Sequence, residues 1–304
     1  MAITIIKKKV PSCNGKNQLA GKLYIPEGEI KGYFHVVHGM TDHINRYDQL
    51  MRELAEKGYL TFGYDHLGHG YTVNNDSEFG FIAERGGDEL LTRDVLTFAE
   101  AVFAEYGEHP YYLMGHSMGS FIARMAVQKY IIPDKFIIMG TSGPNPILGP
   151  GLLLCKLIRY IKGPRHVSRF IENIAFGSYN DHFKEENDPK SWLTNDVEVR
   201  KKYVADRFCR FKFTISAMHD LISLNKNCNS NKWFKSVADK MPILFLSGEE
   251  DPVGDYGRGI YICDEKLIGY GADVTVKLYP EMRHEILNDE CHDEVVSDIL
   301  EFLR

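Results

Sequence analysis

Short apolar runs alternate with amphipathic segments along the first 142 residues of the chain. Two β-type segments, Ile3–Val10 and Leu19–Ile25, are separated by turn residues and predict an antiparallel pair. After them, continuous apolar runs predict buried strands, and segments with apolar residues at helical spacing predict helices. The strands are expected at 33–37, 59–64, 111–114 and 135–139, and the helices at 46–57, 88–106 and 121–130. This alternation is typical of an α/β fold with a mostly parallel sheet.

The pattern changes between residues 143 and 235, where no comparable strand run occurs. This segment opens with a loop rich in Gly and Pro, and an apolar helix is expected at 152–161. Strand signals return at 242–247 and 274–279, and an amphipathic helix closes the chain. We therefore expect one α/β domain made of residues 1–142 and 236–304, with an α-helical insertion at 143–235. Such an insertion is tolerable because the entropy of loop closure grows slowly with length.

Composition narrows the class of protein without identifying it. The 304 residues are 44% hydrophobic and 26% charged, as in ordinary globular proteins. The net charge is −6, so the chain lacks the excess of basic residues that is typical of a nucleic-acid-binding protein. The six cysteines (13, 155, 209, 228, 263 and 291) have no metal-binding spacing and are expected to be reduced thiols. No signal-peptide core or apolar stretch of membrane-spanning length is visible, so we expect a soluble cytoplasmic protein.

The segment from Gly115 to Gly119 reads Gly-His-Ser-Met-Gly and lies between a predicted strand and a predicted helix. This is the context of a nucleophile elbow, a sharp turn that exposes a serine at the edge of the sheet. Larger side chains two residues before or after Ser117 would collide with neighbouring backbone. The helix N-terminus and the Met118 amide N–H favour an oxyanion at the same place. The neighbouring His116 points elsewhere in an elbow, so we interpret it as a packing residue.

A serine nucleophile needs a base, and the base needs an orienting acid. The strand at 274–279 is followed by His284, which lies where the base is expected; His292 is expected to be exposed. The strand at 242–247 is followed by three competing carboxylates. Among them Asp251 is favoured because Pro252 stiffens the next turn, whereas Glu249 and Glu250 are expected to be solvated; Asp255 is a weaker alternative.

The loop after the strand at 33–37 reads His38-Gly39-Met40, and the Met40 N–H is the candidate second oxyanion donor. Histidines are dense around this loop, but they lack the spacing of known hydrolase metal motifs, and we expect neither a metal nor a cofactor. The histidines considered as metal ligands are His35, His38, His43, His66 and His69.

These motifs resemble those of the monoacylglycerol lipase and lysophospholipase group of α/β-hydrolases, the serine aminopeptidase-like Hydrolase_4 set. The matching stretches are 38–50, 64–70, 115–120, 248–254 and 282–289, with softer similarity inside 143–235. The resemblance implies a Ser117–Asp251–His284 triad and oxyanion donors at Met40 and Met118. It also implies that the insertion forms a helical cap over the site.

From the ordered triad we expect a serine esterase that forms an acyl-enzyme, of the monoacylglycerol lipase or lysophospholipase type. The alternatives are an aminopeptidase or amidase acting with the same three residues, and a non-catalytic binding protein of this fold. The expected partner is a small ester or monoacyl lipid, not nucleic acid. The apolar residues between Ile147 and Ile161 are either the face that a helix buries on its own domain or part of a cap helix that lines an acyl tunnel. The second interpretation also suggests a transient contact between the cap and a membrane surface.

Overall fold

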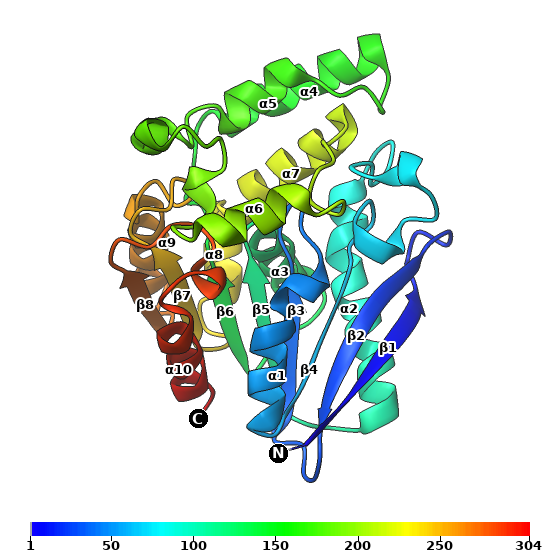
Figure 1. The fold of residues 1–304 in the computed structure, drawn as a ribbon, viewed down its shortest axis with the longest axis vertical. Coiled ribbons are helices and arrows are strands. Elements are labelled where there is room, and N and C mark those ends of the chain that lie inside the picture. The colour runs from blue at the N-terminus through cyan, green and yellow to red at the C-terminus, as the bar shows by residue number, and fades with distance from the viewer. Residues whose placement is uncertain (1) are drawn as a thin grey trace.

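The computed structural model describes residues 2–304, and its eight strands form one sheet in the order β1-β2-β4-β3-β5-β6-β7-β8 (Figure 1). β1 pairs with β2, and β2 with β4, in antiparallel fashion, whereas all later pairs are parallel. The predicted α/β fold with a mostly parallel sheet is therefore confirmed. The strands are β1 (Ile3–Pro11), β2 (Gln18–Pro26), β3 (Gly32–Val37), β4 (Tyr59–Tyr64), β5 (Tyr111–His116), β6 (Lys135–Met139), β7 (Ile243–Gly248) and β8 (Val274–Tyr279).

Helices cover both faces of the sheet and explain why the central strands are apolar throughout. β3, β4 and β5 are buried at every position, with successive side chains entering opposite layers of the core. One layer packs against α1 (Asp48–Glu56) and α10 (His292–Leu303). The other packs against α2 (Gly87–Tyr106), α3 (Met118–Lys129) and α9 (Arg258–Gly269).

Five further helices lie between β6 and β7 in the sequence, and residues 140–242 contain no strand. In Figure 1, α4 and α5 lie farthest from the sheet, while α6 and α7 lie between them and the sheet edge. α4 packs on α7, while α7 and α8 both pack on α3, so the segment is anchored to the core through these two helices. These helices are α4 (Leu148–Lys162), α5 (Arg169–Phe176), α6 (Val197–Ala205), α7 (Ile215–Cys228) and α8 (Asn231–Val237).

Short 3₁₀ helices complete the fold at loop positions. They are η1 (Ile44–Tyr47), η2 (Gly70–Thr72), η3 (Asp76–Glu78), η4 (Asp181–Glu186), η5 (Ser191–Leu193) and η6 (Ile286–Asn288). Within the described chain, no helix has both the length and the apolar character needed to cross a bilayer.

Helix boundaries differ most from the sequence prediction near Gly, Pro and loop residues. The helix expected at 46–57 is a 3₁₀ turn followed by α1, which begins at Asp48. α4 begins at Leu148, before the predicted 152, because Pro150 lies in its first turn, where a missing N–H costs nothing. α9 was not predicted, although its buried Ile260, Cys263 and Leu267 have helical spacing.

Candidate active site

The turn between β5 and α3 places Ser117 in a strained backbone conformation. Its φ of 53° and ψ of −124° are rare for a residue with a side chain and cost about 1–3 kcal/mol. Hydrogen bonds hold the turn: the Ser117 N–H donates to the Met139 carbonyl at 3.0 Å, and the Ser120 N–H donates to the Ser117 carbonyl at 2.9 Å. Ser117 remains partly exposed among buried neighbours. The strand and helix therefore present its hydroxyl at the carboxyl edge of the sheet.

Two glycines allow this turn to lie against β3. A Cβ at Gly119 would lie 2.0 Å from the Val37 carbonyl oxygen and 2.4 Å from that of His38. A Cβ at Gly115 would lie 2.5 Å from the Gly119 carbonyl oxygen. Since real Cβ atoms do not approach backbone this closely, any larger residue at either position would displace the turn.

The predicted acid and base are in contact at the ends of β7 and β8. The Oδ2 atom of Asp251 lies 2.9 Å from Nδ1 of His284, and both side chains are buried. The Val253 N–H donates to the other Asp251 oxygen at 2.9 Å, which fixes the carboxylate in its turn. The alternative Asp255 is exposed and lies 3.8 Å from Arg258 instead. Among the carboxylates considered from sequence, Asp251 is the one that contacts His284.

Burial and a neighbouring carboxylate have opposite effects on the pKa of His284. Burial disfavours its cation, but the Asp251 carboxylate, through its charge and its hydrogen bond, holds the pKa of His284 above the usual 6.5. The buried ring of His116 lies 4.8 Å away, and burial and the charge of His284 lower the pKa of His116 to about 4. His116 therefore stays neutral when His284 titrates.

The serine and histidine loops meet through His116, the neighbour of Ser117, whose Nε2 lies 3.1 Å from the His284 carbonyl oxygen. Glycines border both loops. A Cβ at Gly140 would lie 3.2 Å from Cε1 of His284, and a Cβ at Gly39 would lie 3.2 Å from Cβ of Ser117. In the described chain, Ser117 Oγ does not hydrogen-bond to Nε2 of His284. Such bonds are often long before substrate binds and tighten in the reacting complex.

The loop after β3 passes close to the serine, because a Cβ at Gly39, the residue before Met40, would lie 3.2 Å from Cβ of Ser117. Met118 is the first residue of α3, so its amide lies among the unpaired N–H groups of a helix start. The Asp42 carboxylate holds the loop by accepting from the Gly39 N–H at 3.3 Å and the Tyr47 hydroxyl at 2.8 Å. Burial opposes the Asp42 charge, but Arg46 and neighbouring polar groups keep the pKa of Asp42 below its usual value.

His116 and His292, the other two histidines considered for the base, have structural contacts. His116 bonds through Nδ1 to the Tyr47 hydroxyl at 2.9 Å and through Nε2 to the His284 carbonyl at 3.1 Å, which matches its predicted packing role. The expectation that His292 is exposed was wrong. Its ring bonds to the Leu287 carbonyl and the Glu53 carboxylate, because the start of α10 packs beside α1.

Ion pairs on both sides of His284 were missed from sequence. Arg283 donates to the Glu186 carboxylate at 2.5 Å and to the Ser191 carbonyl at 2.7 Å. The Glu285 carboxylate accepts hydrogen bonds from both terminal nitrogens of Arg46, at 2.8 and 2.5 Å. The charges around the base were visible in the sequence, but their partners lie 97 and 239 residues away, beyond the range of any local pattern.

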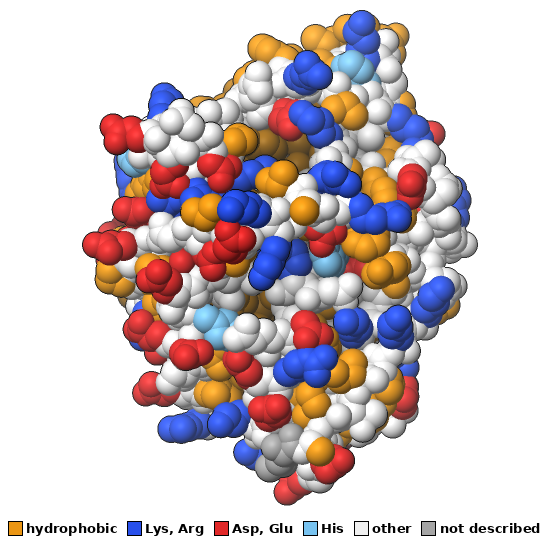
Figure 2. Space-filling model, in the orientation of Figure 1, with side chains coloured by type: hydrophobic (Ala, Val, Ile, Leu, Met, Phe, Trp, Pro, Cys, Tyr) orange, Lys and Arg blue, Asp and Glu red, His pale blue; other side chains and the backbone are white. Residues whose placement is uncertain are grey.

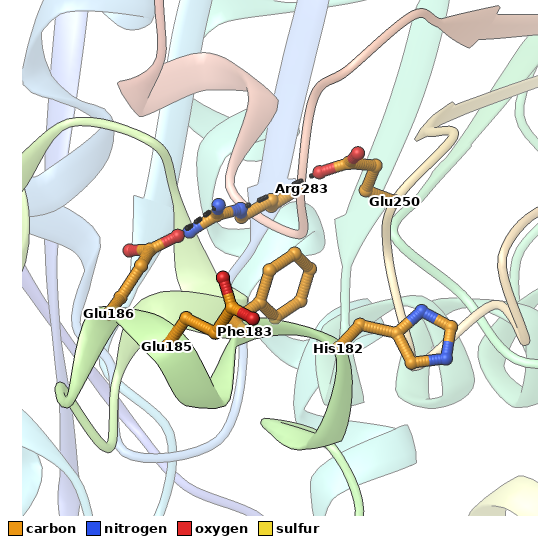
Figure 3. A pocket seen from close by; sticks show the side chains of 6 residues that line it. All are labelled: His182, Phe183, Glu185, Glu186, Glu250 and Arg283. Carbon is orange, nitrogen blue, oxygen red and sulfur yellow. Dashed lines mark hydrogen bonds and ion pairs between the residues drawn. The ribbon is translucent and has the colours of Figure 1, made fainter.

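A cavity of about 470 Å³ borders the ion pair between Arg283 and Glu186. Figure 3 shows Arg283 between Glu186 and Glu250, with the Phe183 ring below its guanidinium. The Arg283 guanidinium lies 4.0 Å from the centre of that ring. Because Glu250 precedes Asp251 and Arg283 precedes His284, this cavity lies beside the loops that carry Asp251 and His284.

One group of side chains among residues 2–304 has the composition of a metal site. His43, Asp206 and Cys209 place one potential ligand atom each within 4.8 Å of one another. However, His43 Nε2 is already hydrogen-bonded to Asp206 at 3.0 Å, and Arg46 carries a positive charge nearby. Burial and the Asp42 carboxylate raise the pKa of the Cys209 thiol, whereas a metal ligand must lose its proton. These residues fit a hydrogen-bonded contact between loops better than a cation.

Known proteins resemble this chain over most of its length. The profile of Hydrolase_4, described as serine aminopeptidase, S33, matches residues 28–291. Human monoglyceride lipase is 35% identical over 282 residues, which cover 90% of this chain and 81% of that protein. Monoacylglycerol lipase of Mycolicibacterium smegmatis is 23% identical over 289 residues, covering 92% of this chain and 91% of that protein.

Solved structures give the same fold over the whole chain. A thermostable carboxyl esterase from Bacillus coagulans, in complex with glycerol, has a TM-score of 0.93 and 28% identity, covering 99% of this chain and 98% of that one. A soluble variant of Saccharomyces cerevisiae monoglyceride lipase, in complex with a substrate analogue, has a TM-score of 0.74 and 19% identity, covering 100% and 95%. With the family profile spanning most of its length, this chain belongs to the Hydrolase_4 family of α/β-hydrolases, the serine aminopeptidase S33 group.

Proposed function

We propose that this protein is a serine hydrolase of carboxylic esters, of the monoacylglycerol lipase or lysophospholipase type. Ser117 Oγ attacks the ester carbonyl while His284 Nε2 takes the serine proton. Asp251 accepts the Nδ1–H bond, which fixes the tautomer and stabilises the imidazolium that forms. The Met40 and Met118 amides donate to the oxyanion of the tetrahedral intermediate. Loss of one such donor typically lowers kcat by about 10²–10³-fold.

The intermediate collapses when the alcohol leaves with the proton held by His284, and an acyl-enzyme remains on Ser117. Water then gives its proton to His284 and attacks the acyl carbonyl. The acid is released as the proton returns to Ser117. The observation that carries this proposal is the hydrogen-bonded Asp251–His284 pair beside a strained, partly exposed serine.

We further propose that residues 143–235 form a cap that selects the substrate. Trp192 lies 5.2 Å from the His284 ring, and the Glu285 N–H donates to the Leu193 carbonyl at 2.7 Å, so this segment contacts the base. Figure 2 shows a hollow with hydrophobic side chains beneath the level of α4 and α5. An acyl chain bound in this hollow would be stabilised by about 25 cal/mol for each Å² of apolar surface that it removes from water.

The outer side of the cap supports the proposed transient contact with a membrane surface. Residues 143–235 carry 16 Lys and Arg against 9 Asp and Glu, although the whole chain is acidic. Several large apolar side chains of the same segment are exposed, and an apolar patch with basic residues suits an anionic bilayer. Salt-sensitive flotation with phosphatidylglycerol vesicles would support the contact, and absence of flotation would refute it. The exposed residues are Ile147, Leu153, Leu157, Tyr160, Ile161, Phe170 and Ile174.

A substrate panel tests the proposed class. We expect kcat/KM to rise from acetyl to medium and long acyl esters, and 1-monoacylglycerol to be cleaved, because each buried CH₂ contributes about 0.8 kcal/mol. Peptide anilides should be poor substrates. Highest activity on the acetyl ester would contradict the acyl site, and preferential cleavage of anilides would support an aminopeptidase or amidase instead.

The pH profile tests the assignment of the base. His284 must be neutral to take a proton, and its pKa is raised above 6.5 by Asp251 against the opposing effect of burial. We therefore expect kcat/KM to be maximal at alkaline pH and to fall as the pH decreases, with the midpoint of the fall above pH 6.5. A flat profile between pH 5 and 8 would contradict this role.

The cysteines support a reducing compartment. All six are free in the described chain, and disulfides are uncommon in the cytosol. A cytoplasmic location is therefore part of the proposal, and cell fractionation with antibody detection tests it.

A further inference from the structure

Tyr203 of α6 contacts the loop that carries Met40. Its hydroxyl lies 2.7 Å from Thr41 Oγ1 and donates to the Thr41 carbonyl oxygen at 3.1 Å. The Tyr203 side chain is buried, and 162 residues separate it from Thr41 in the sequence. α6, which lies between β6 and β7 in the sequence, therefore holds a loop of the core. Its Tyr203 contacts both the side chain and the backbone of Thr41.

Thr41 is held in an unfavourable conformation. Its φ is 48°, in the left-handed region that a β-branched residue rarely adopts. Such a residue persists only where its surroundings hold it. Asp42 holds the core side of the same loop, where it accepts from the Gly39 and His43 N–H groups. Tyr203 supplies the contacts to Thr41 itself.

The Tyr203 ring is itself fixed between two cations. The Arg46 guanidinium lies 4.9 Å from the ring centre, and Lys190 Nζ lies 5.2 Å from it. Arg46 also forms the two-pronged ion pair with Glu285, which follows His284 in the chain. Tyr203 is thus held by the same group that contacts the loop of the base.

We propose that Tyr203 is a positioning residue of the reaction: by keeping Thr41 left-handed, it directs the preceding Met40 N–H toward the oxyanion formed at Ser117. This inference rests on the proposed function and adds a residue that sequence motifs do not reveal. The orientation of an oxyanion donor then depends on α6, so displacement of this helix releases the loop and lowers turnover.

The test uses Tyr203→Phe, which keeps the ring and removes the hydroxyl. With p-nitrophenyl butyrate, we expect kcat to fall about tenfold, the equivalent of one hydrogen bond, with KM within about twofold of wild type. The inhibition constant of an alkyl boronic acid, which forms a tetrahedral adduct on serine, should rise by a similar factor. Tyr261→Phe, at a half-exposed position of α9, is the matched control and should behave as wild type.

A double-mutant cycle separates positioning from a role in folding alone. Glycine adopts positive φ without strain, so Thr41→Gly makes the Tyr203 hydroxyl less necessary. We expect Tyr203→Phe to reduce kcat less than about threefold in the Thr41→Gly background. Equal losses in the two backgrounds, or a change in KM with kcat preserved, would overturn the inference.

Active-site titration with a fluorophosphonate keeps this result distinct from the proposed function. If the probe labels Ser117 in wild type and Tyr203→Phe retains wild-type kcat, only the inference about Tyr203 fails. If Ser117 is not labelled and is not needed for ester cleavage, the proposed function fails.

Discussion

Ser117→Ala is expected to lower kcat for ester hydrolysis by about 10⁵–10⁶-fold, the loss seen when a triad nucleophile is removed. Only the oxyanion donors and substrate binding then remain to assist attack by water. The variant should fold, because it loses one partly exposed hydroxyl while the elbow keeps its backbone hydrogen bonds. Initial rates with a p-nitrophenyl ester, together with the circular dichroism melting curve, provide the measurement.

The matched control for this experiment is Ser297→Ala on the exposed side of α10. This variant also removes a serine hydroxyl, but from a position distant in sequence from the elbow. It should keep wild-type kcat. If Ser117→Ala also kept wild-type turnover, Ser117 would not be the nucleophile.

The second large effect is expected for Asp251→Asn, with kcat reduced by about 10⁴-fold. An amide in place of the carboxylate no longer stabilises the imidazolium and favours the wrong tautomer of His284. Because Asp251 is what raises the pKa of His284 against burial, the acidic limb of the remaining activity should also move to lower pH. The full pH–rate profile measures both changes.

Asp255→Asn is the control that separates Asp251 from Asp255, the alternative acid named from sequence. Asp255 is exposed and faces Arg258, so its removal should leave both kcat and the acidic limb unchanged. A larger loss in Asp255→Asn than in Asp251→Asn would reverse the assignment.

Much of the core was predictable because its signals are local. β4, β6 and β8 were predicted with their observed bounds, since each is a short β-type run between turn residues. The elbow was predictable because its glycines are required by contacts within a few residues and with the adjacent strand. The order of serine, acid and histidine on successive strand ends then placed Asp251 and His284 at the same edge of the sheet.

The contacts around the site were not predictable because they join distant segments. No spacing rule connects Tyr203 with Thr41, or Arg46 with Glu285. The first pair depends on how α6 docks on the core, and the second joins loops from opposite ends of the sequence. The apolar segment at 152–161 also carried an ambiguous signal. α4 packs on α7 on one side, yet exposes Leu153 and Leu157 on another, and hydrophobicity alone does not separate these two faces.

The most direct test of the account is mass spectrometry of the protein after reaction with an alkyl fluorophosphonate. We expect one covalent adduct per chain, located by peptide fragmentation on Ser117 and formed more slowly while an excess of monoacylglycerol competes for the site. The His284→Ala variant should react far more slowly, since its serine lacks a base. An unmodified Ser117 in a protein that still cleaves esters, or an adduct on another residue, would contradict the account.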